Sequence, residues 1–189
     1  MLFTLAAAAY LVALGLFIAL HLRGNYSLLR HAVSDYAIGP TRGLFLTYGL
    51  AGGLGAALVG CGVLVQGGLP VRSGVYLLAS AGVRLGVLGF STDLEGQPVT
   101  RAGLLHLVFA IAGFALVYMA IDSLQPFARD LVTGPVRTTL VWLHTVATLS
   151  LIGVVVCLYP ALRRVFGLVE RAFLLSTLLW LLTFAAVMG

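Results

Sequence analysis

Six long apolar stretches run through this sequence of 189 residues with only short connections between them. They cover residues 3–22, 42–66, 73–91, 101–123, 137–160 and 166–188. A helix needs about 20 mostly apolar residues to cross the hydrocarbon of a bilayer, and the stretches are of that length. Hydrophobic residues make up 61% of the chain and charged residues 9%, which leaves a soluble fold too little polar surface. We therefore predict an all-α integral membrane protein, residues 1–189, built as one bundle of six transmembrane helices.

The distribution of arginine predicts how the bundle is oriented, because the chain contains no lysine. One side, formed by the first, third and fifth loops, carries Arg23, Arg30, Arg42, Arg101, Arg163, Arg164 and Arg171, and the other carries Arg72, Arg129 and Arg137. The positive-inside rule then places the arginine-rich loops in the cytoplasm and both termini outside, in a multi-pass protein of the cell membrane. The net charge of +5 follows from this bias, so we expect no nucleic-acid partner.

Arg84 lies well inside the third of these apolar stretches. An ionisable group at membrane depth is costly unless it faces a protein interior or water, so it marks a candidate functional site. Helical spacing places Ser73, Tyr76, Ser80, Arg84 and Ser91 on one stripe, which we expect to face the bundle interior. At 1.5 Å per residue Arg84 lies roughly 10 Å from the cytoplasmic end of its helix.

Further polar residues gather at the same end of the bundle. His106 is nearly level with Arg84, and Asp93 and Asp35 lie in the adjoining loops together with Glu95. We expect Asp93 or Asp35 to pair with the Arg84 guanidinium, since such a pair is strong in a medium of low dielectric. The alternative is purely structural, with a buried arginine that clamps two loops onto the bundle.

The first loop is long enough to hold a helix of its own. Ser27 can cap such a helix, and residues 39–40, Gly-Pro, would end it. On this helix His31, Ser34 and Asp35 share one face, and we expect it to lie at the membrane surface or against the bundle. Neighbouring side chains of one helix turn point in parallel directions, so these three types are poorly placed to form a catalytic triad.

Two sets of residues follow as candidates for a site at this end. The acid, base or nucleophile candidates are Asp93, His106, Asp35 and Ser34. The ligand-binding candidates are Arg84, Arg101, His31 and Ser91. For a metal ion, the candidate cluster is His21, His31 and His106 with Asp93 or Asp35, although no two histidines have the helical spacing typical of zinc hydrolases.

Other residues argue against particular cofactors or crosslinks. His144 and His106 differ in depth by about 12 Å, which does not suit two axial ligands of one haem. We expect His144 and Thr148 to form a hydrogen-bonded pair inside the bundle. Cys61 and Cys157 fall at opposite sides of the membrane, so we expect two buried free thiols and no disulfide.

Glycine and proline indicate close packing and one irregular segment. Small residues four apart, Gly49 with Gly53 and Gly82 with Gly86, are typical of helices that approach each other closely. The segment 124–136 contains two prolines and a glycine, and we predict an irregular outer loop there.

Short motifs in the first and third loops resemble those of the family called domain of unknown function 998. The resemblance rests on residues 31–39, HAVSDYAIG, and residues 89–96, GFSTDLEG, followed by a histidine at the start of the fourth stretch. The matching positions are Ser34, Asp35, Asp93 and His106. Ser91 stands where the family pattern has proline. The resemblance implies a small multi-pass prokaryotic membrane protein and implies no particular activity.

These observations favour a membrane-embedded enzyme or binder of a lipid or other amphiphilic small molecule. A small transporter is the first alternative, and it would need a polar track through the midplane or broken helices. The second is an accessory subunit, or a homo-oligomer, that uses its glycine ridges to contact partner helices.

Overall fold

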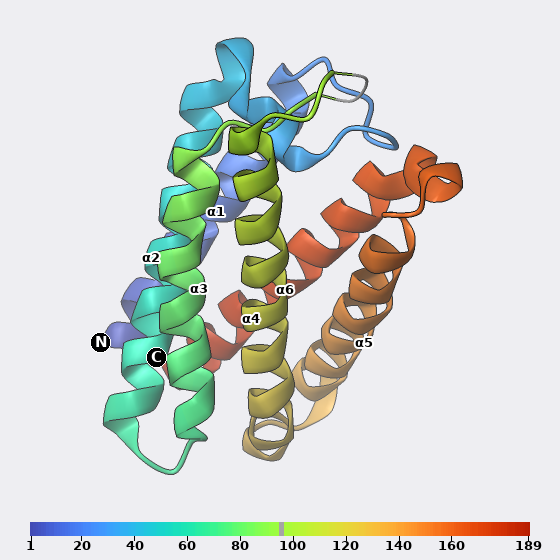
Figure 1. Cartoon of the computed structure of the whole chain (residues 1–189). Coiled ribbons are helices and arrows are strands. Elements are labelled where there is room, and N and C mark those ends of the chain that lie inside the picture. Colours follow the sequence, from blue (N-terminus) through green and yellow to red (C-terminus); the bar gives the residue numbers. More distant parts are fainter. Residues whose placement is uncertain (95–96) are drawn as a thin grey trace.

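The computed structural model describes residues 1–94 and 97–189 and contains six helices that are long and apolar enough to span a membrane. These helices are α1 (Leu2–Arg23), α2 (Arg42–Gln66), α3 (Val71–Gly89), α4 (Arg101–Leu131), α5 (Gly134–Val156) and α6 (Phe166–Met188) (Figure 1). Three short 3-10 segments accompany them, η1 (Val33–Ala37), η2 (Gly39–Thr41) and η3 (Pro160–Val165). The described residues form no β-strand, so the predicted all-α class and the six helices are confirmed.

The bundle has one end where the first, third and fifth connections meet, which we call the loop end (Figure 1). The α2–α3 and α4–α5 connections lie at the opposite end. The two termini lie close together in Figure 1, as expected for an even number of membrane crossings. α1, α2 and α6 bury many aromatic side chains, among them Trp180 and Phe184, whose rings stack with centroids 5.4 Å apart. This apolar core holds the helices that carry the polar groups at the loop end.

The prediction of an irregular segment at 124–136 is wrong, because α4 continues to Leu131 with Pro126 inside it. Proline removes a backbone donor and disfavours a helix interior. Here the turn around it is held by tertiary contacts. Gln125 accepts a hydrogen bond from Nε1 of Trp180 at 2.7 Å, and Leu124 and Ala128 are buried. Packing outweighs the local preference.

Glycine permits close contacts between α2, α3 and α4. A Cβ atom at Gly49 would collide with the side chain of Leu88 on α3, and one at Gly86 would collide with Phe109 on α4. At Gly53 the nearest neighbour is the side chain of Arg84. Open space surrounds Gly82, so the predicted ridge on α3 makes a close contact at one of its two positions.

The predicted helix in the first loop is also wrong, since residues 33–41 form two 3-10 segments. Val33, Asp35 and Tyr36 are buried, whereas Leu28 and Leu29 are half-exposed. The segment therefore lies against the bundle, which was one of the two expected positions. The N–H of Val33 at its start and the carbonyl of His31 just before it bond to side chains of α6, in place of the bonds that an α-helix would make within itself.

Candidate functional site

Two adjoining cavities open at the loop end of the bundle. The inner cavity, of about 80 Å³, lies among α2, α3, α4 and α6. The outer cavity, of about 210 Å³, lies among the first loop, the third loop, α4, the end of α5 and the start of α6. The residues that line both are Ser34, His106, Ala110, Phe114 and Glu170. This shared wall places two ionisable side chains where the cavities meet.

Arg84 supplies the positive charge of the inner cavity, which Tyr48, Ser80 and Thr177 also line. Its guanidinium lies over Gly52 of α2, where the absence of a side chain leaves room for it. The predicted inward orientation of Arg84 is therefore confirmed. Within the described residues, none of the ion pairs involves Arg84.

The predicted pairing of Arg84 with Asp93 or Asp35 is wrong, because both carboxylates are used locally. Asp93 accepts hydrogen bonds at 2.8 Å from the backbone N–H and from the hydroxyl of Thr100, the residue that caps α4. Asp35 accepts from Nδ1 of His31 at 3.0 Å. Asp93 thus stabilises the start of α4, and both carboxylates lie in the wall of the outer cavity.

His106 is held in one tautomer by the backbone of the third loop. Its Nδ1 lies 3.0 Å from the carbonyl oxygen of Phe90, and a carbonyl can only accept, so Nδ1 carries the proton. In the neutral ring Nε2 is then an acceptor. This Nε2 is buried and has no protein partner among the described residues. Of the buried polar atoms without a partner, it is the one whose residue lines these two cavities.

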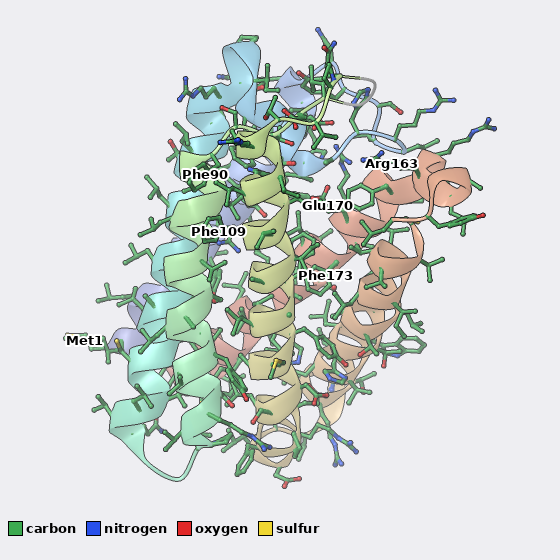
Figure 2. All side chains as sticks on the ribbon, in the orientation of Figure 1. Met1, Phe90, Phe109, Arg163, Glu170 and Phe173 are labelled. Atoms are coloured by element: carbon green, nitrogen blue, oxygen red, sulfur yellow. The ribbon has the colours of Figure 1, made fainter. Side chains whose placement is uncertain are left out.

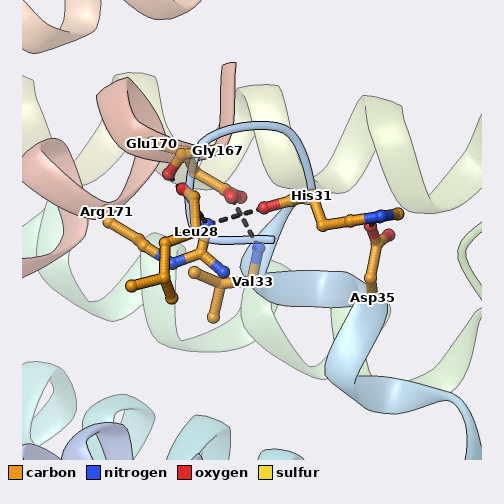
Figure 3. Close-up of polar contacts among 7 residues, drawn as sticks. All are labelled: Leu28, His31, Val33, Asp35, Gly167, Glu170 and Arg171. Atoms are coloured by element: carbon orange, nitrogen blue, oxygen red, sulfur yellow. Dashed lines mark hydrogen bonds and ion pairs between the residues drawn. The ribbon is translucent and has the colours of Figure 1, made fainter. Parts of the chain in front are cut away.

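Glu170 of α6 joins the first loop to the shared wall, and it is 6% exposed. The backbone N–H of Val33 donates to its Oε2 at 2.6 Å, as the dashed line in Figure 3 shows. Figure 2 shows Glu170 between α6 and α4 at the loop end. The carboxylate therefore fixes the 3-10 segment that carries Ser34, and it borders both cavities.

Arg171, the next residue of α6, holds the same loop through its carbonyl groups. Its Nη1 donates to the carbonyl oxygens of Leu28 at 3.2 Å, His31 at 2.6 Å and Gly167 at 2.9 Å (Figure 3). Its Nε donates to Nε2 of His21 at 2.8 Å, and Nδ1 of His21 bonds to the Phe17 carbonyl. The guanidinium lies 5.8 Å from the centre of the Tyr36 ring, a cation–π distance. Arg171 is thus a buried clamp between α1, α6 and the first loop.

The remaining predicted site residues divide between the cavity walls and the surface. Ser34 lines both cavities, and Asp35 lines the outer one. Burial raises the pKa of Asp35 above its usual range, and the hydrogen bond from His31 opposes that rise. Ser91 is exposed and lies beyond the end of α3, so it does not continue the predicted stripe. Arg101 is exposed at the start of α4 and lines neither cavity.

The three histidines of the predicted metal cluster are not brought together. His21 bonds to Arg171, His31 to Asp35, and His106 to the third loop. Across residues 1–94 and 97–189, no group of three His, Cys, Asp or Glu side chains is arranged to hold a metal ion. Glu95 lies outside the described residues.

The histidine near the opposite end has a partner that differs from the predicted one. Nε2 of His144 bonds to Asp122 at 3.1 Å, while Thr148 donates to the His144 backbone carbonyl. The predicted pair of His144 and Thr148 is therefore linked only through the main chain. Both cysteines are free, as expected, although Cys61 is half-buried and only Cys157 is buried.

The interpretation of the sequence missed Glu170 and Arg171. The arginine distribution places Arg171 with the fifth loop, and Glu170 is in neither set of candidates, although both lie in the apolar stretch 166–188. The signal was present, because a carboxylate and a guanidinium in an apolar helix need partners for the same reason as Arg84. α6 begins at Phe166, so both side chains belong to the helix and not to the loop before it.

The fold is that of a multi-pass membrane protein with six spanning helices. The family described as protein of unknown function (DUF998) matches residues 5–187, and the chain belongs to that family. This match confirms the resemblance that the loop motifs indicated. Comparisons with curated proteins and with solved structures gave no significant match.

Proposed function

We propose that the inner cavity binds the polar group of an amphiphilic small molecule, with its anionic group at Arg84 and a hydroxyl hydrogen at Nε2 of His106. The observation that carries this proposal is the buried, unpartnered Nε2 of His106 in the cavity that Arg84 also lines. A buried acceptor without a partner costs about 1–3 kcal/mol, and a ligand donor offsets that cost.

The chemistry of the lining selects the class of ligand. A guanidinium presents several N–H donors that match the oxygens of a phosphate or carboxylate. The remaining wall is largely apolar, with Phe45, Val87, Leu88, Val117 and Leu174 among its residues. A ligand that reaches such a cavity from the membrane carries an apolar part, which makes a phosphate-bearing lipid the favoured class.

An enzyme is the second candidate, and the tautomer of His106 favours it. The Phe90 carbonyl fixes the proton on Nδ1, so Nε2 has the orientation and the free lone pair that a general base needs. Incubation of the purified protein with phosphatidic acid, followed by mass spectrometry, tests for turnover. Turnover that disappears in His106→Gln while binding persists would support catalysis, and unchanged lipid would leave the protein a binder.

For the orientation, we retain the arrangement in which the loop end faces the cytoplasm and the protein lies in the cell membrane. The support is the excess of arginine in the three connections of that end. Labelling of intact cells with a membrane-impermeant thiol reagent tests it. In a variant without Cys61 and Cys157, a cysteine at Arg164 should stay unlabelled until the cells are opened.

Binding is tested with dihexanoyl phosphatidic acid, a short phosphate-bearing amphiphile, and with dihexanoylglycerol, which lacks the phosphate. A ligand at one hundred times its dissociation constant stabilises the folded state by about 2.7 kcal/mol. We expect a clear rise in Tm with the phosphatidic acid and little with dihexanoylglycerol. The rise should disappear in Arg84→Met and persist in Arg101→Met, since Arg101 lines neither cavity. An equal rise in both variants would overturn the proposal.

A further inference from the structure

The outer cavity is a groove with one apolar wall along α4. The side chains of α4 in this wall are Leu104, Leu107, Ala110, Ile111 and Phe114. Val154 of α5, Leu158 just beyond the end of α5 and Phe166 of α6 also line this cavity. Figure 1 shows α4 and α5 diverging toward the loop end, which is where this cavity lies.

The groove is open to the membrane, and its length matches one leaflet. Leu104, Leu107 and Ile111 are 54%, 43% and 47% exposed although they line the cavity. The lining of α4 runs from Gly103 to Phe114, which at 1.5 Å per residue is about 16 Å. Half of a hydrocarbon core of roughly 30 Å is nearly the same length. A chain that entered from the leaflet at the loop end would therefore fit along it.

Two exposed arginines stand at the loop end of this groove. Arg30 of the first loop and Arg163 of η3 both line the outer cavity (Figure 2 labels Arg163). Basic side chains at the membrane surface attract anionic lipid headgroups. Inward from them lie His106 and Glu170, which separate this cavity from the inner one.

We infer that the outer cavity holds an acyl chain of a phospholipid that enters sideways, between α4 and α5, from the leaflet at the loop end. Arg30 and Arg163 attract its phosphate to the mouth of the groove, and the headgroup reaches Arg84 past the shared wall. This inference rests on the proposed function and adds the ligand's class and its route. The occupant is a lipid because an apolar groove of leaflet length ends at two exposed arginines, while the carboxylates of Asp35 and Asp93 at the same end already accept hydrogen bonds from His31 and Thr100.

Photo-crosslinking tests the route with the full-length protein in bilayers that contain phosphatidic acid carrying a diazirine in its acyl chain. We expect labelling of residues 103–114 and 154–158 at least fivefold above that of the exposed face of α1. Ile111→Trp fills the groove and should lower this labelling at least fivefold. Val108→Trp is the matched control, because Val108 is 54% exposed on α4 and lines neither cavity. Leu107→Trp repeats the block if Ile111→Trp does not fold.

The outcomes separate this inference from the proposed function. Uniform labelling around the protein would mean boundary lipid only and would overturn the acyl-chain route, even if short-chain phosphatidic acid still stabilises the protein through Arg84. Equal labelling of Ile111→Trp and Val108→Trp would overturn it as well. Enriched, blockable labelling without stabilisation by the short-chain lipid would support the groove and contradict the headgroup site at Arg84.

Discussion

The two arginines at the loop end, Arg171 and Arg84, have opposite surroundings. Arg171 is 8% exposed and donates through Nε and Nη1 to one imidazole and three backbone carbonyls. Arg84 lines a cavity and forms none of the ion pairs of the described residues. The first guanidinium organises the chain, whereas the second is available to a ligand. A buried charged side chain therefore indicates a ligand site only when the protein itself does not supply its hydrogen-bond and ion-pair partners.

The purely structural role that was the alternative for Arg84 belongs instead to Arg171. In that alternative a buried arginine clamps two loops onto the bundle, and the structure shows such a clamp for the first loop, at Arg171 of α6. Glu170 holds the same loop through a different backbone group. It accepts a hydrogen bond from the Val33 N–H, whereas Arg171 donates to carbonyl oxygens. Two adjacent residues of opposite charge thus fix both kinds of backbone group in one loop.

The largest effect on stability is expected from Arg171→Met. The substitution introduces an apolar side chain of similar length and leaves the Leu28 and His31 carbonyls of the first loop and the buried Gly167 carbonyl of α6 without this donor. We expect the free energy of unfolding to fall by about 3 kcal/mol, because each buried group left without a partner costs 1–3 kcal/mol. Thermal and denaturant unfolding in detergent measure it. Arg23→Met is the control, since Arg23 is exposed at the end of α1; an equal loss there would contradict the clamp.

A smaller effect is expected at Glu170, and it separates hydrogen bonding from charge. Glu170→Ala leaves the Val33 N–H without its acceptor and should lower the free energy of unfolding by about 2 kcal/mol. Glu170→Gln retains an acceptor oxygen and should recover most of that loss. The same unfolding measurement compares the two. Equal destabilisation by both variants would show that the charge, and not the hydrogen bond, holds the loop.

The sequence predicted the helices well because their signal is local. Apolar length set the spans, and α2 and α6 begin and end at the predicted residues. The exceptions depend on contacts between distant segments. Pro126 stays inside α4 because Gln125 bonds to Trp180, and no local pattern reveals such a contact.

The site was predicted in part, for a related reason. Polarity at membrane depth pointed to Arg84 and His106, and both line the inner cavity. The hydrogen-bond partner of each polar side chain could not be predicted from the sequence, because it depends on which atoms of the loops face the bundle. Asp93 illustrates this, since the same carboxylate could meet Arg84 or cap α4, and the Thr100 contacts decide for the cap.

Arg84→Met should change binding greatly and stability little, whereas Arg171→Met is expected to lower stability. Met occupies similar space over Gly52, and Arg84 has no ion pair among the described residues to lose. We expect the free energy of unfolding to change by less than about 1 kcal/mol. Titration with dihexanoyl phosphatidic acid, followed by Tm, should show at least a tenfold weaker response. If Arg84→Met lowered the free energy of unfolding as much as Arg171→Met, Arg84 would have a structural role like that of Arg171.

The smallest expected effect is the pH dependence of stability that Asp35 contributes. Burial raises the pKa of Asp35 in the folded state above its ordinary value of 3.8, so the folded protein binds the proton more tightly than the unfolded chain. Stability is then greatest below that value and falls as pH rises from 3.8 to the raised folded pKa. Asp35→Asn should flatten the unfolding profile across this window. His31→Phe removes the hydrogen bond that lowers this pKa and should extend the window to higher pH. A decline that is unchanged in Asp35→Asn would assign the pH dependence of stability to another group.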